Sequence, residues 1–266
     1  MLDAGSFFAL DRFAHGELFT GSEYVWDGLK NLKTYMDDQV APVLVHPGLT
    51  LGTPLAQPLV LHHGILSCSR EYEFIFGNTT AGGLQVLQNG HLLRGASVIM
   101  AGAMLLGKRI ALGEGVLVES GAMIKEPAII GDCTEVRQGA YLRGYCLVGK
   151  RCVVGHATEV KHSIFLDDAK AGHFAYLGDS ILGNGVNLGA GTKFANLRFL
   201  GGSIKIKTPD GPVDTGLRKF GAVLGDRAQT GCNSVTNPGT LLGPEAILMP
   251  NTTAPSGFHP GKTVIR

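Results

Sequence analysis

Three cationic residues recur at intervals of eighteen along the middle of the chain: Lys125, Arg143 and Lys161. In a repeat that closes one turn every eighteen residues, they lie above one another on one face. Cations in such a column repel one another unless acids or an anion join them, and Glu119 and Glu159 are acids that could do so. The spacing leaves two interpretations open, a solvated structural column or a binding site for a substrate phosphate.

Histidines form a second group of candidates. His173 falls one shortened turn after His156, and His162 lies on the adjoining face of the same repeat. Imidazoles titrate near neutral pH, so a cluster of them could supply a general base, hold a metal or simply lie at the surface. The spacing by itself does not choose among these roles.

The element that must position these residues is a repeat of six. Every sixth residue is aliphatic at eleven successive places: Met100, Leu106, Leu112, Val118, Ile124, Ile130, Val136, Leu142, Val148, Val154 and Val160. A helix has an apolar period of 3.6 and a half-buried strand a period of 2, so neither explains six. A short strand followed by a corner does, with the aliphatic residue pointing inward. Three such hexads close a triangular coil, and stacked coils predict a parallel β-helix.

The repeat also predicts the limits of the β-helix. Its phase slips by one residue after Ile164 and again after Ile181, and it continues from Leu224 to Leu248 after a loop. We assign residues 94–253 to the β-helix, with a loop insertion at residues 196–220. Within that loop, residues 203–215 predict a protruding hairpin with a Pro-Asp-Gly turn.

The two ends of the chain lack the hexads. Residues 1–40 are predicted to be helical, because Val25, Leu29, Leu32 and Met36 follow helical spacing, and to cap an open end of the coil. Residues 41–93 are predicted to form irregular early coils, and residues 254–266 a tail without regular structure.

Composition supports a repetitive β structure and excludes some functions. The chain has 266 residues, of which 17% are charged, 7% are aromatic and 39 are glycine, and its formal net charge is +1. Such a balance argues against binding to nucleic acid or a membrane surface through bulk charge. No apolar run is long enough to span a bilayer. The five cysteines contain no C-x-x-C pair, which favours free thiols in a reducing compartment and predicts a cytoplasmic protein.

Two motifs resemble those of a known enzyme family. The stretch Ala171-Gly-His-Phe-Ala-Tyr-Leu-Gly-Asp179, followed by Asn187-Leu-Gly-Ala-Gly-Thr192, resembles the acetyltransferase domain of the bifunctional glucosamine-1-phosphate N-acetyltransferase/N-acetylglucosamine-1-phosphate uridyltransferase. Residues 196–198, 213–219, 225–226 and 237–239 resemble the archaeal sugar-phosphate nucleotidyltransferase/acetyltransferase form of that domain. The resemblance covers roughly residues 95–250. It implies an all-β, left-handed parallel β-helix and a homotrimer, and the handedness comes from the resemblance alone.

The resemblance also implies roles for individual residues. Arg143 and Lys161 match the family's sugar-phosphate-binding pair, and His173 matches its catalytic histidine. The residues that match amino-sugar contacts are Glu159, Tyr176, Asn187 and Asn196. The residues expected to bind coenzyme A are Gly189, Ala190, Gly191, Arg218, Lys219 and Cys232.

These assignments predict an acetyl-CoA-dependent N-acetyltransferase. Its acceptor is expected to be an amino-sugar phosphate similar to glucosamine-1-phosphate, or a nucleotide-linked amino sugar. Arg143 and Lys161 would fix the phosphate, and His173 would take a proton from the attacking amine. A backbone N–H near residues 189–191 would stabilise the thioester oxyanion, so that direct acyl transfer requires no metal. The chain contains no glycine-rich uridyltransferase loop, so we expect a separate nucleotidyltransferase as a partner.

Two other classes of function remain open. A zinc enzyme similar to the γ-class carbonic anhydrases would use the histidines as ligands, although their spacing of six and then eleven residues differs from that family's. A catalytically inert β-helix, acting as a scaffold or as a sugar-nucleotide-binding protein, would bind ligand without turnover. An enzyme that transfers a longer acyl chain, like the lipid A acyltransferases, is a variant of the predicted N-acetyltransferase.

Overall fold

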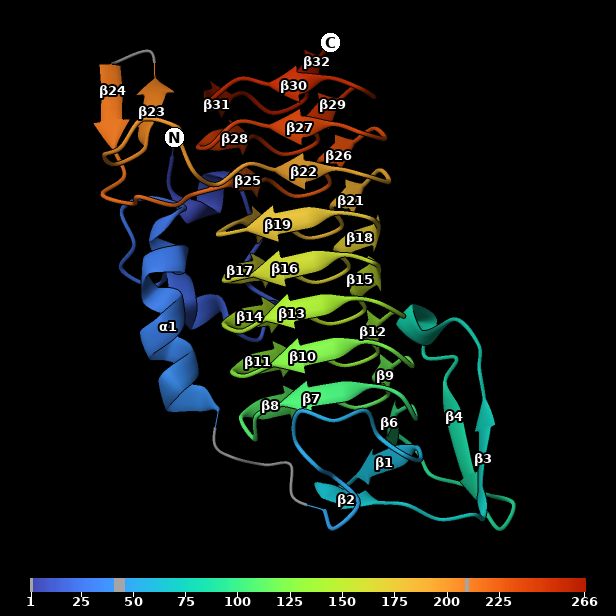
Figure 1. The fold of residues 1–266 in the computed structure, drawn as a ribbon. Coiled ribbons are helices and arrows are strands. Elements are labelled where there is room, and N and C mark those ends of the chain that lie inside the picture. The colour runs from blue at the N-terminus through green and yellow to red at the C-terminus, as the bar shows by residue number, and fades with distance from the viewer. Residues whose placement is uncertain (1, 41–45, 209–210) are drawn as a thin grey trace.

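The computed structural model describes residues 2–40, 46–208 and 211–266, and its central feature is a three-sided prism of stacked coils (Figure 1). Each side is a sheet of short strands. Neighbouring strands of the coils are parallel, and most partners are seventeen or eighteen residues apart, as in Tyr141 with Glu159 and Glu159 with Tyr176. The predicted parallel β-helix is confirmed.

The first side, which we name the His173 face, is an eleven-stranded sheet. In chain order its strands are β1 (Leu59–His62), β2 (Ile65–Ser67), β6 (Ser97–Ile99), β9 (Leu117–Val118), β12 (Glu135–Val136), β15 (Val153–His156), β18 (Lys170–His173), β21 (Asn187–Leu188), β26 (Gln229–Thr230), β29 (Ile247–Leu248) and β32 (Val264–Ile265).

The second side, the Lys161 face, has eight strands. They are β7 (Met104–Leu106), β10 (Met123–Lys125), β13 (Tyr141–Arg143), β16 (Glu159–Lys161), β19 (Tyr176–Gly178), β22 (Lys193–Phe194), β27 (Val235–Thr236) and β30 (Thr253–Ala254).

The third side, the covered face, also has eight strands. They are β8 (Ile110–Leu112), β11 (Ala128–Ile130), β14 (Cys146–Val148), β17 (Ser163–Phe165), β20 (Ile181–Leu182), β25 (Ala222–Leu224), β28 (Thr240–Leu242) and β31 (Gly257–His259).

The coil is left-handed. In Figure 1 the strands of the Lys161 face run leftward, the chain returns behind through the covered face and the His173 face, and each coil lies above the one before it. This confirms the handedness that the resemblance implied.

The inward residues form one apolar core along the axis of the prism. The predicted inward positions from Val118 to Val160 are at most 1% exposed. Both shortened turns are confirmed as well, since Val148 pairs with Phe165 and Ile164 pairs with Ile181, each after seventeen residues.

The inward assignment was wrong in the first coil. Ile99 and Leu105 point inward there, in register with Val118 and Ile124, in place of Met100 and Leu106. The reason is one extra corner residue between β7 and β8. A shift of one residue moves every side chain of a strand to the opposite face.

We predicted that the N-terminal segment caps an open end of the coil. It packs along the covered face instead. It holds two short 3-10 helices, η1 (Ala4–Ser6) and η2 (Gly16–Phe19), and the helix α1 (Asp27–Gln39). The stripe predicted on α1 is confirmed, because Leu29, Leu32 and Met36 are at most 1% exposed. These residues join a core with outward residues of the covered face, including Leu147 and Ile164. An apolar outer face needs cover along its whole length, which explains this position.

The hairpin predicted in the loop insertion is confirmed as β23 (Lys205–Thr208) and β24 (Gly211–Asp214). Of its predicted Pro-Asp-Gly turn, residues 209–210 lie outside the described part of the chain. The hairpin does not simply protrude, since Ile204 and Ile206 are buried in the core of the covered face.

We expected irregular early coils over residues 41–93, of which 41–45 lie outside the described part of the chain. Residues 46–93 form antiparallel structure instead. Strands β1 and β2 pair with each other, and β1 pairs antiparallel with β6, so that Leu59 and Leu66 close the lower end of the axial core. A separate antiparallel sheet follows, made of β3 (Tyr72–Ile75), β4 (Gln85–Gln88) and β5 (His91–Leu92). Between β3 and β4 lies the short helix η3 (Thr79–Ala81). This sheet packs on the outer side of the His173 face through Val86, next to Val98 and Leu117.

The C-terminal tail was also predicted wrongly. Residues 253–265 form β30, β31 and β32, which make one more coil. The hexads are less regular there, but each strand still adds to an existing sheet edge, and this satisfies its backbone hydrogen bonds. No helix in the described residues is long and apolar enough to cross a membrane.

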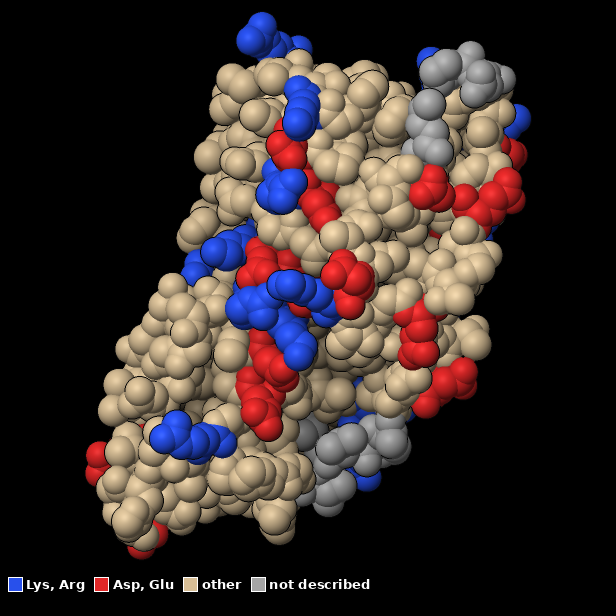
Figure 2. All heavy atoms as spheres, turned by 180° about the vertical axis from the view of Figure 1, so that it is seen from behind, with Lys and Arg blue, Asp and Glu red and all other residues tan. Residues whose placement is uncertain are grey.

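Charged residues gather in a band that crosses the coils on the back of the prism (Figure 2). Both signs mix in ion pairs such as Lys150–Asp132 at 2.9 Å and Arg151–Asp168 at 2.7 Å. Asp167 also accepts a hydrogen bond from the backbone N–H of Lys150 at 2.9 Å. Because both signs alternate in the band, it has no single sign that would attract nucleic acid.

Candidate active site

The structure divides the predicted site residues between two sides of the prism. The residues on or at the edge of the Lys161 face are Arg143, Glu159, Lys161, Tyr176, Asn196, Arg218 and Lys219. The residues on the His173 face are His173, Asn187, Gly189, Ala190, Gly191 and Cys232. His173 and Tyr176 lie close to the corner between the two sides, which the chain turns at Phe174 with a φ of 52°.

On the Lys161 face, the predicted cationic column is present, and its members are not all free. Lys125 lies next to Arg143 on the neighbouring strand. The Nη1 atom of Arg143 donates a hydrogen bond to Oε1 of Glu159 at 2.6 Å. Glu159 and Tyr176 belong to the neighbouring column of the same face, because Glu159 pairs in register with Tyr176, whereas Lys161 pairs with Gly178. Burial, together with the charges of Glu159 and Asp179, raises the pKa of Tyr176, so its hydroxyl stays protonated.

Asp179 is the centre of this polar cluster, and we did not predict it as a site residue. It lies in the motif that carries the family resemblance, and that motif was the signal that could have identified it. Its carboxylate accepts hydrogen bonds from Lys161 Nζ at 3.2 Å, from His162 Nδ1 at 3.0 Å and from Asn196 Nδ2 at 2.5 Å. Asn196 Oδ1 accepts in turn from the Tyr176 hydroxyl at 3.4 Å.

The electrostatics of Asp179 follow from these contacts. Burial by itself would raise its pKa. The hydrogen bond from His162, the charge of Lys161 and the hydrogen bond from Asn196 outweigh burial and hold the pKa below its ordinary value. Asp179 is therefore a charged anchor that orients three side chains toward the Lys161 face.

Asp179→Asn is expected to lower the free energy of unfolding by about 1–3 kcal/mol at pH 7, because three donors lose a charged acceptor. The depressed pKa means that this contribution is present at pH above 3.8 and is lost as the pH falls through the lower folded-state value. Denaturant titrations of both proteins at pH 7 and below pH 3.8 measure the difference.

The matched control is Asp38→Asn, on the exposed side of α1. It should change stability by less than about 0.5 kcal/mol. An Asp179→Asn deficit that stays constant down to the lowest pH would contradict the charged-anchor interpretation.

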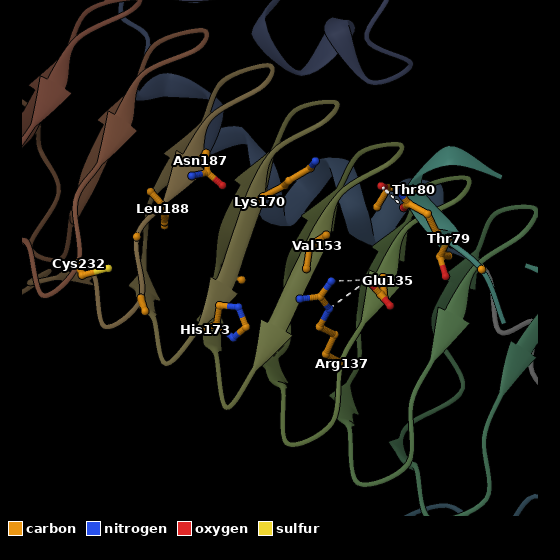
Figure 3. A pocket seen from close by; sticks show the side chains of 15 residues that line it. Thr79, Thr80, Glu135, Arg137, Val153, Lys170, His173, Asn187, Leu188 and Cys232 are labelled. Carbon is orange, nitrogen blue, oxygen red and sulfur yellow. Dashed lines mark hydrogen bonds and ion pairs between the residues drawn. The ribbon is translucent and has the colours of Figure 1, made fainter. Parts of the chain in front are cut away.

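On the His173 face, a groove of about 610 Å³ crosses the coils (Figure 3). Lys170 and Asn187 belong to one outward column of this face. His173 and Ala190 line the groove as well, and Cys232 lies at one end of the view. Residues 77–80 overhang the opposite end.

Glycines keep the floor of the groove low. A Cβ atom on Gly189 would lie 2.4 Å from the backbone of Gly231, so no other residue fits there without movement. A Cβ atom on Gly172, by contrast, would meet nothing within 4 Å, because it would point into the groove. The strip between the side-chain columns can thus accept a thin ligand chain against the backbone.

His173 ends strand β18 and lies exposed beside this floor. It pairs in register with His156, which confirms that the two histidines are one turn apart. The His156 side chain is bound to the carbonyl oxygen of Gln138 at 2.9 Å, whereas the His173 side chain has no hydrogen bond or ion pair with any described residue. Both ring nitrogens of His173 are therefore available to a ligand. His162 bonds to Asp179 near the corner of the other side, so the three histidines do not converge within one chain.

The predicted coenzyme A residues divide in the same way. Gly189, Ala190 and Cys232 line the groove, Gly191 lies next to it in the chain, and their binding of coenzyme A stays a prediction. Arg218 and Lys219 do not line the groove, because they lie exposed on the loop that follows the hairpin. This loop is held by an isolated backbone β-bridge between Lys219 and Leu197, and by a hydrogen bond from Phe220 N to Asn196 O. Contacts from that distant loop cannot be inferred from hexad spacing.

Four features of the groove were not predicted: Glu135, Arg137, Lys170 and residues 77–80. Lys170 directly precedes the motif that begins at Ala171, so the local sequence contained a signal for it. Residues 77–80 come from outside the repeat, and no sequence signal places them here.

Known proteins are similar to part of this chain. A family model described as the GMPPB C-terminal domain matches residues 124–209. A bifunctional sugar-1-phosphate nucleotidylyltransferase/acetyltransferase of Sulfurisphaera tokodaii is 37% identical over 111 residues, which cover 42% of this chain and 28% of the relative. A bifunctional protein GlmU of Methanocaldococcus jannaschii is 38% identical over 104 residues, covering 39% of this chain and 25% of the relative.

The resemblance stated from the motifs is therefore confirmed as sequence similarity, and the chain spans about a quarter of the length of these curated relatives. Among solved structures, a mutant of GDP-perosamine N-acetyl transferase from Caulobacter crescentus, in complex with CoA and GDP-perosamine, is 18% identical. The match covers 62% of this chain and 53% of that chain at a TM-score of 0.27, which is too low to support a statement about this chain.

Proposed function

We propose that this chain is an acetyl-CoA-dependent N-acetyltransferase that acts on an amino-sugar phosphate or a nucleotide-linked amino sugar. The observation that carries the proposal is the groove on the His173 face, where an unpaired imidazole lies beside a glycine floor. The similarity to sugar-phosphate nucleotidylyltransferase/acetyltransferases supports the chemical class. The five free cysteines support the cytoplasmic location that this function requires.

The groove offers two of the groups that acyl transfer needs. His173 is the candidate base, because a proton must leave the amine as it attacks the thioester carbon. The N–H of Gly189 donates to Thr230 and that of Gly191 donates to His173, so both are engaged. The Ala190 N–H has no partner among the described residues and lies in the groove wall, which makes it the candidate donor for the thioester oxyanion. The carbonyl is rebuilt as the coenzyme A thiolate leaves, and no metal or covalent intermediate is required.

We further propose that the complete site is shared between two copies in a homotrimer. The polar cluster with Arg143 and Lys161 lies on a different side from His173, and the third side is covered by the N-terminal segment. Two open sides that each hold part of a site can meet in a cyclic assembly, where the Lys161 face of one copy lies against the His173 face of the next.

Mixing two variants tests the shared site. His173→Ala and Arg143→Ala, refolded together in equal amounts, should recover about a quarter of wild-type activity at low acceptor concentration, because each mixed trimer has one interface with both residues intact. Activity no higher than the average of the two separate variants would contradict a shared site. Light scattering that shows a monomer would also contradict it.

The function is tested by thiol release from acetyl-CoA in the presence of a panel of acceptors: glucosamine-1-phosphate, a nucleotide-linked amino sugar and unphosphorylated glucosamine. We expect saturable thiol release, with N-acetylated product found by mass spectrometry, and a preference for phosphorylated acceptors. Binding of acetyl-CoA without turnover on the whole panel would overturn the proposal in favour of an inert β-helix.

A further inference from the structure

The end of the groove beneath residues 77–80 carries positive charge that the proposed chemistry does not use. Lys170 is exposed in the groove and has no ion pair with any described residue. Arg137 also lines the groove and directly follows β12, which lies two coils below the β18 strand of Lys170. Two basic side chains in one pocket favour an anionic ligand.

Glu135 orients Arg137 without using all of its donors. Nε and Nη2 of Arg137 both donate to the same oxygen of Glu135, at 3.0 and 2.9 Å. The remaining nitrogen, Nη1, has no partner among the described residues. Figure 3 shows it directed away from Glu135, toward the side of the groove where His173 lies. A guanidinium held in this way presents its free edge to a ligand with little loss of side-chain entropy.

The overhanging residues 77–80 add polar groups to the same end. Asn78 O accepts from Gly83 N at 2.8 Å and from Ala81 N at 3.0 Å, which fixes the segment in place. Thr79 lines the groove, is 2% exposed, and its hydroxyl has no hydrogen-bond partner. A buried hydroxyl without a partner is costly unless a ligand or water satisfies it.

The other cations predicted to bind phosphate are ion-paired, as Arg137 is. Arg143 is paired with Glu159, and Lys161 is paired with Asp179. Within one chain, the unpaired cation of the groove that holds His173 is therefore Lys170.

We propose that Lys170, Arg137 and residues 77–80 form an anion subsite at this end of the groove, which binds a phosphate or pyrophosphate group of one of the two substrates. The subsite deepens the proposed function and rests on it only for the source of the anion. That source is either the coenzyme or the phosphorylated acceptor, since both carry the same chemistry.

Calorimetric titration with inorganic pyrophosphate tests the subsite without any turnover. The wild-type protein should bind pyrophosphate, and Lys170→Gln and Arg137→Gln should each weaken the affinity about 10-fold or more, as expected for loss of one charge-assisted contact. The control Lys108→Gln, at an exposed corner beside β7, should bind like wild type. No binding to wild type, or equal binding by all four proteins, would overturn the subsite.

Steady-state kinetics identify the source of the anion. If Lys170→Gln raises KM for acetyl-CoA but not for acetyl-pantetheine, which lacks the nucleotide phosphates, the coenzyme occupies the subsite. If it raises KM for glucosamine-1-phosphate but not for glucosamine, the acceptor does. Turnover with no change in any KM would overturn the subsite and leave the proposed function standing. Pyrophosphate binding that depends on Lys170, without turnover on any acceptor, would support the subsite and overturn the proposed function.

Discussion

Replacing His173 with alanine is expected to lower the turnover number about 10²–10⁴-fold, the usual contribution of a general base. Acetyl-CoA binding should change little, because the His173 side chain is exposed in the groove and has no hydrogen bond to a described residue, while its backbone contacts remain in the variant. Thiol release under saturating substrates measures the first quantity, and calorimetric titration with acetyl-CoA measures the second.

Arg143→Ala is the matched contrast to His173→Ala. A contact with phosphate exists both before and during the reaction, so its loss should raise KM for a phosphorylated acceptor by about 10–100-fold with a smaller effect on turnover. An unphosphorylated amino sugar should show little change. The pair of variants therefore separates a base from an anchor in one assay.

His156→Ala provides a second control for the His173 experiment. His156 is the neighbour of His173 in the sheet, but its ring is bound to the carbonyl oxygen of Gln138. It is not needed as a base, so most of the turnover should remain. Equal, full activity of His173→Ala and wild type on the best acceptor would remove the catalytic assignment.

Trp26→Ala is expected to destabilise the protein by about 3–5 kcal/mol, the cost of truncating a large buried aromatic residue. Trp26 is completely buried. Its ring stacks on that of Tyr24, with 4.6 Å between the ring centroids, and its centroid lies 6.1 Å from that of the Phe220 ring. It therefore joins the N-terminal segment to the loop that ends at Phe220. Denaturant titration measures the loss.

A control on α1, which begins directly after Trp26, distinguishes this effect from damage to the helix. Thr34→Ala, at an exposed position of α1, should change stability by no more than about 0.5 kcal/mol. Removal of residues 1–40 should have a larger effect than either substitution. It would expose the apolar outer face at Leu147 and Ile164, and the protein should lose solubility. An unchanged denaturation midpoint for Trp26→Ala would show that the segment does not stabilise the prism.

The β-helix could be predicted from sequence because its contacts are periodic. A corner every six residues places Ile124, Leu142 and Val160 above one another whatever the rest of the chain does. The same arithmetic, with the two shortened turns, predicted that His156 and His173 are neighbours. It failed in the first coil because one extra corner residue there is not marked by any break in the aliphatic pattern.

The sequence by itself determined the coil, its register beyond the first coil, the amphipathic stripe of α1 and a part of each polar surface. Only the tertiary structure decided that α1 covers one side of the prism, that Lys161 and His173 lie on different sides, and that residues 77–80 overhang the groove beside Lys170. Local sterics and a fixed repeat specify which residues meet one coil apart. Where residues 2–40 and 46–93 pack depends instead on which apolar outer surfaces remain to be covered, and this is a property of the assembled prism rather than of any short stretch of sequence.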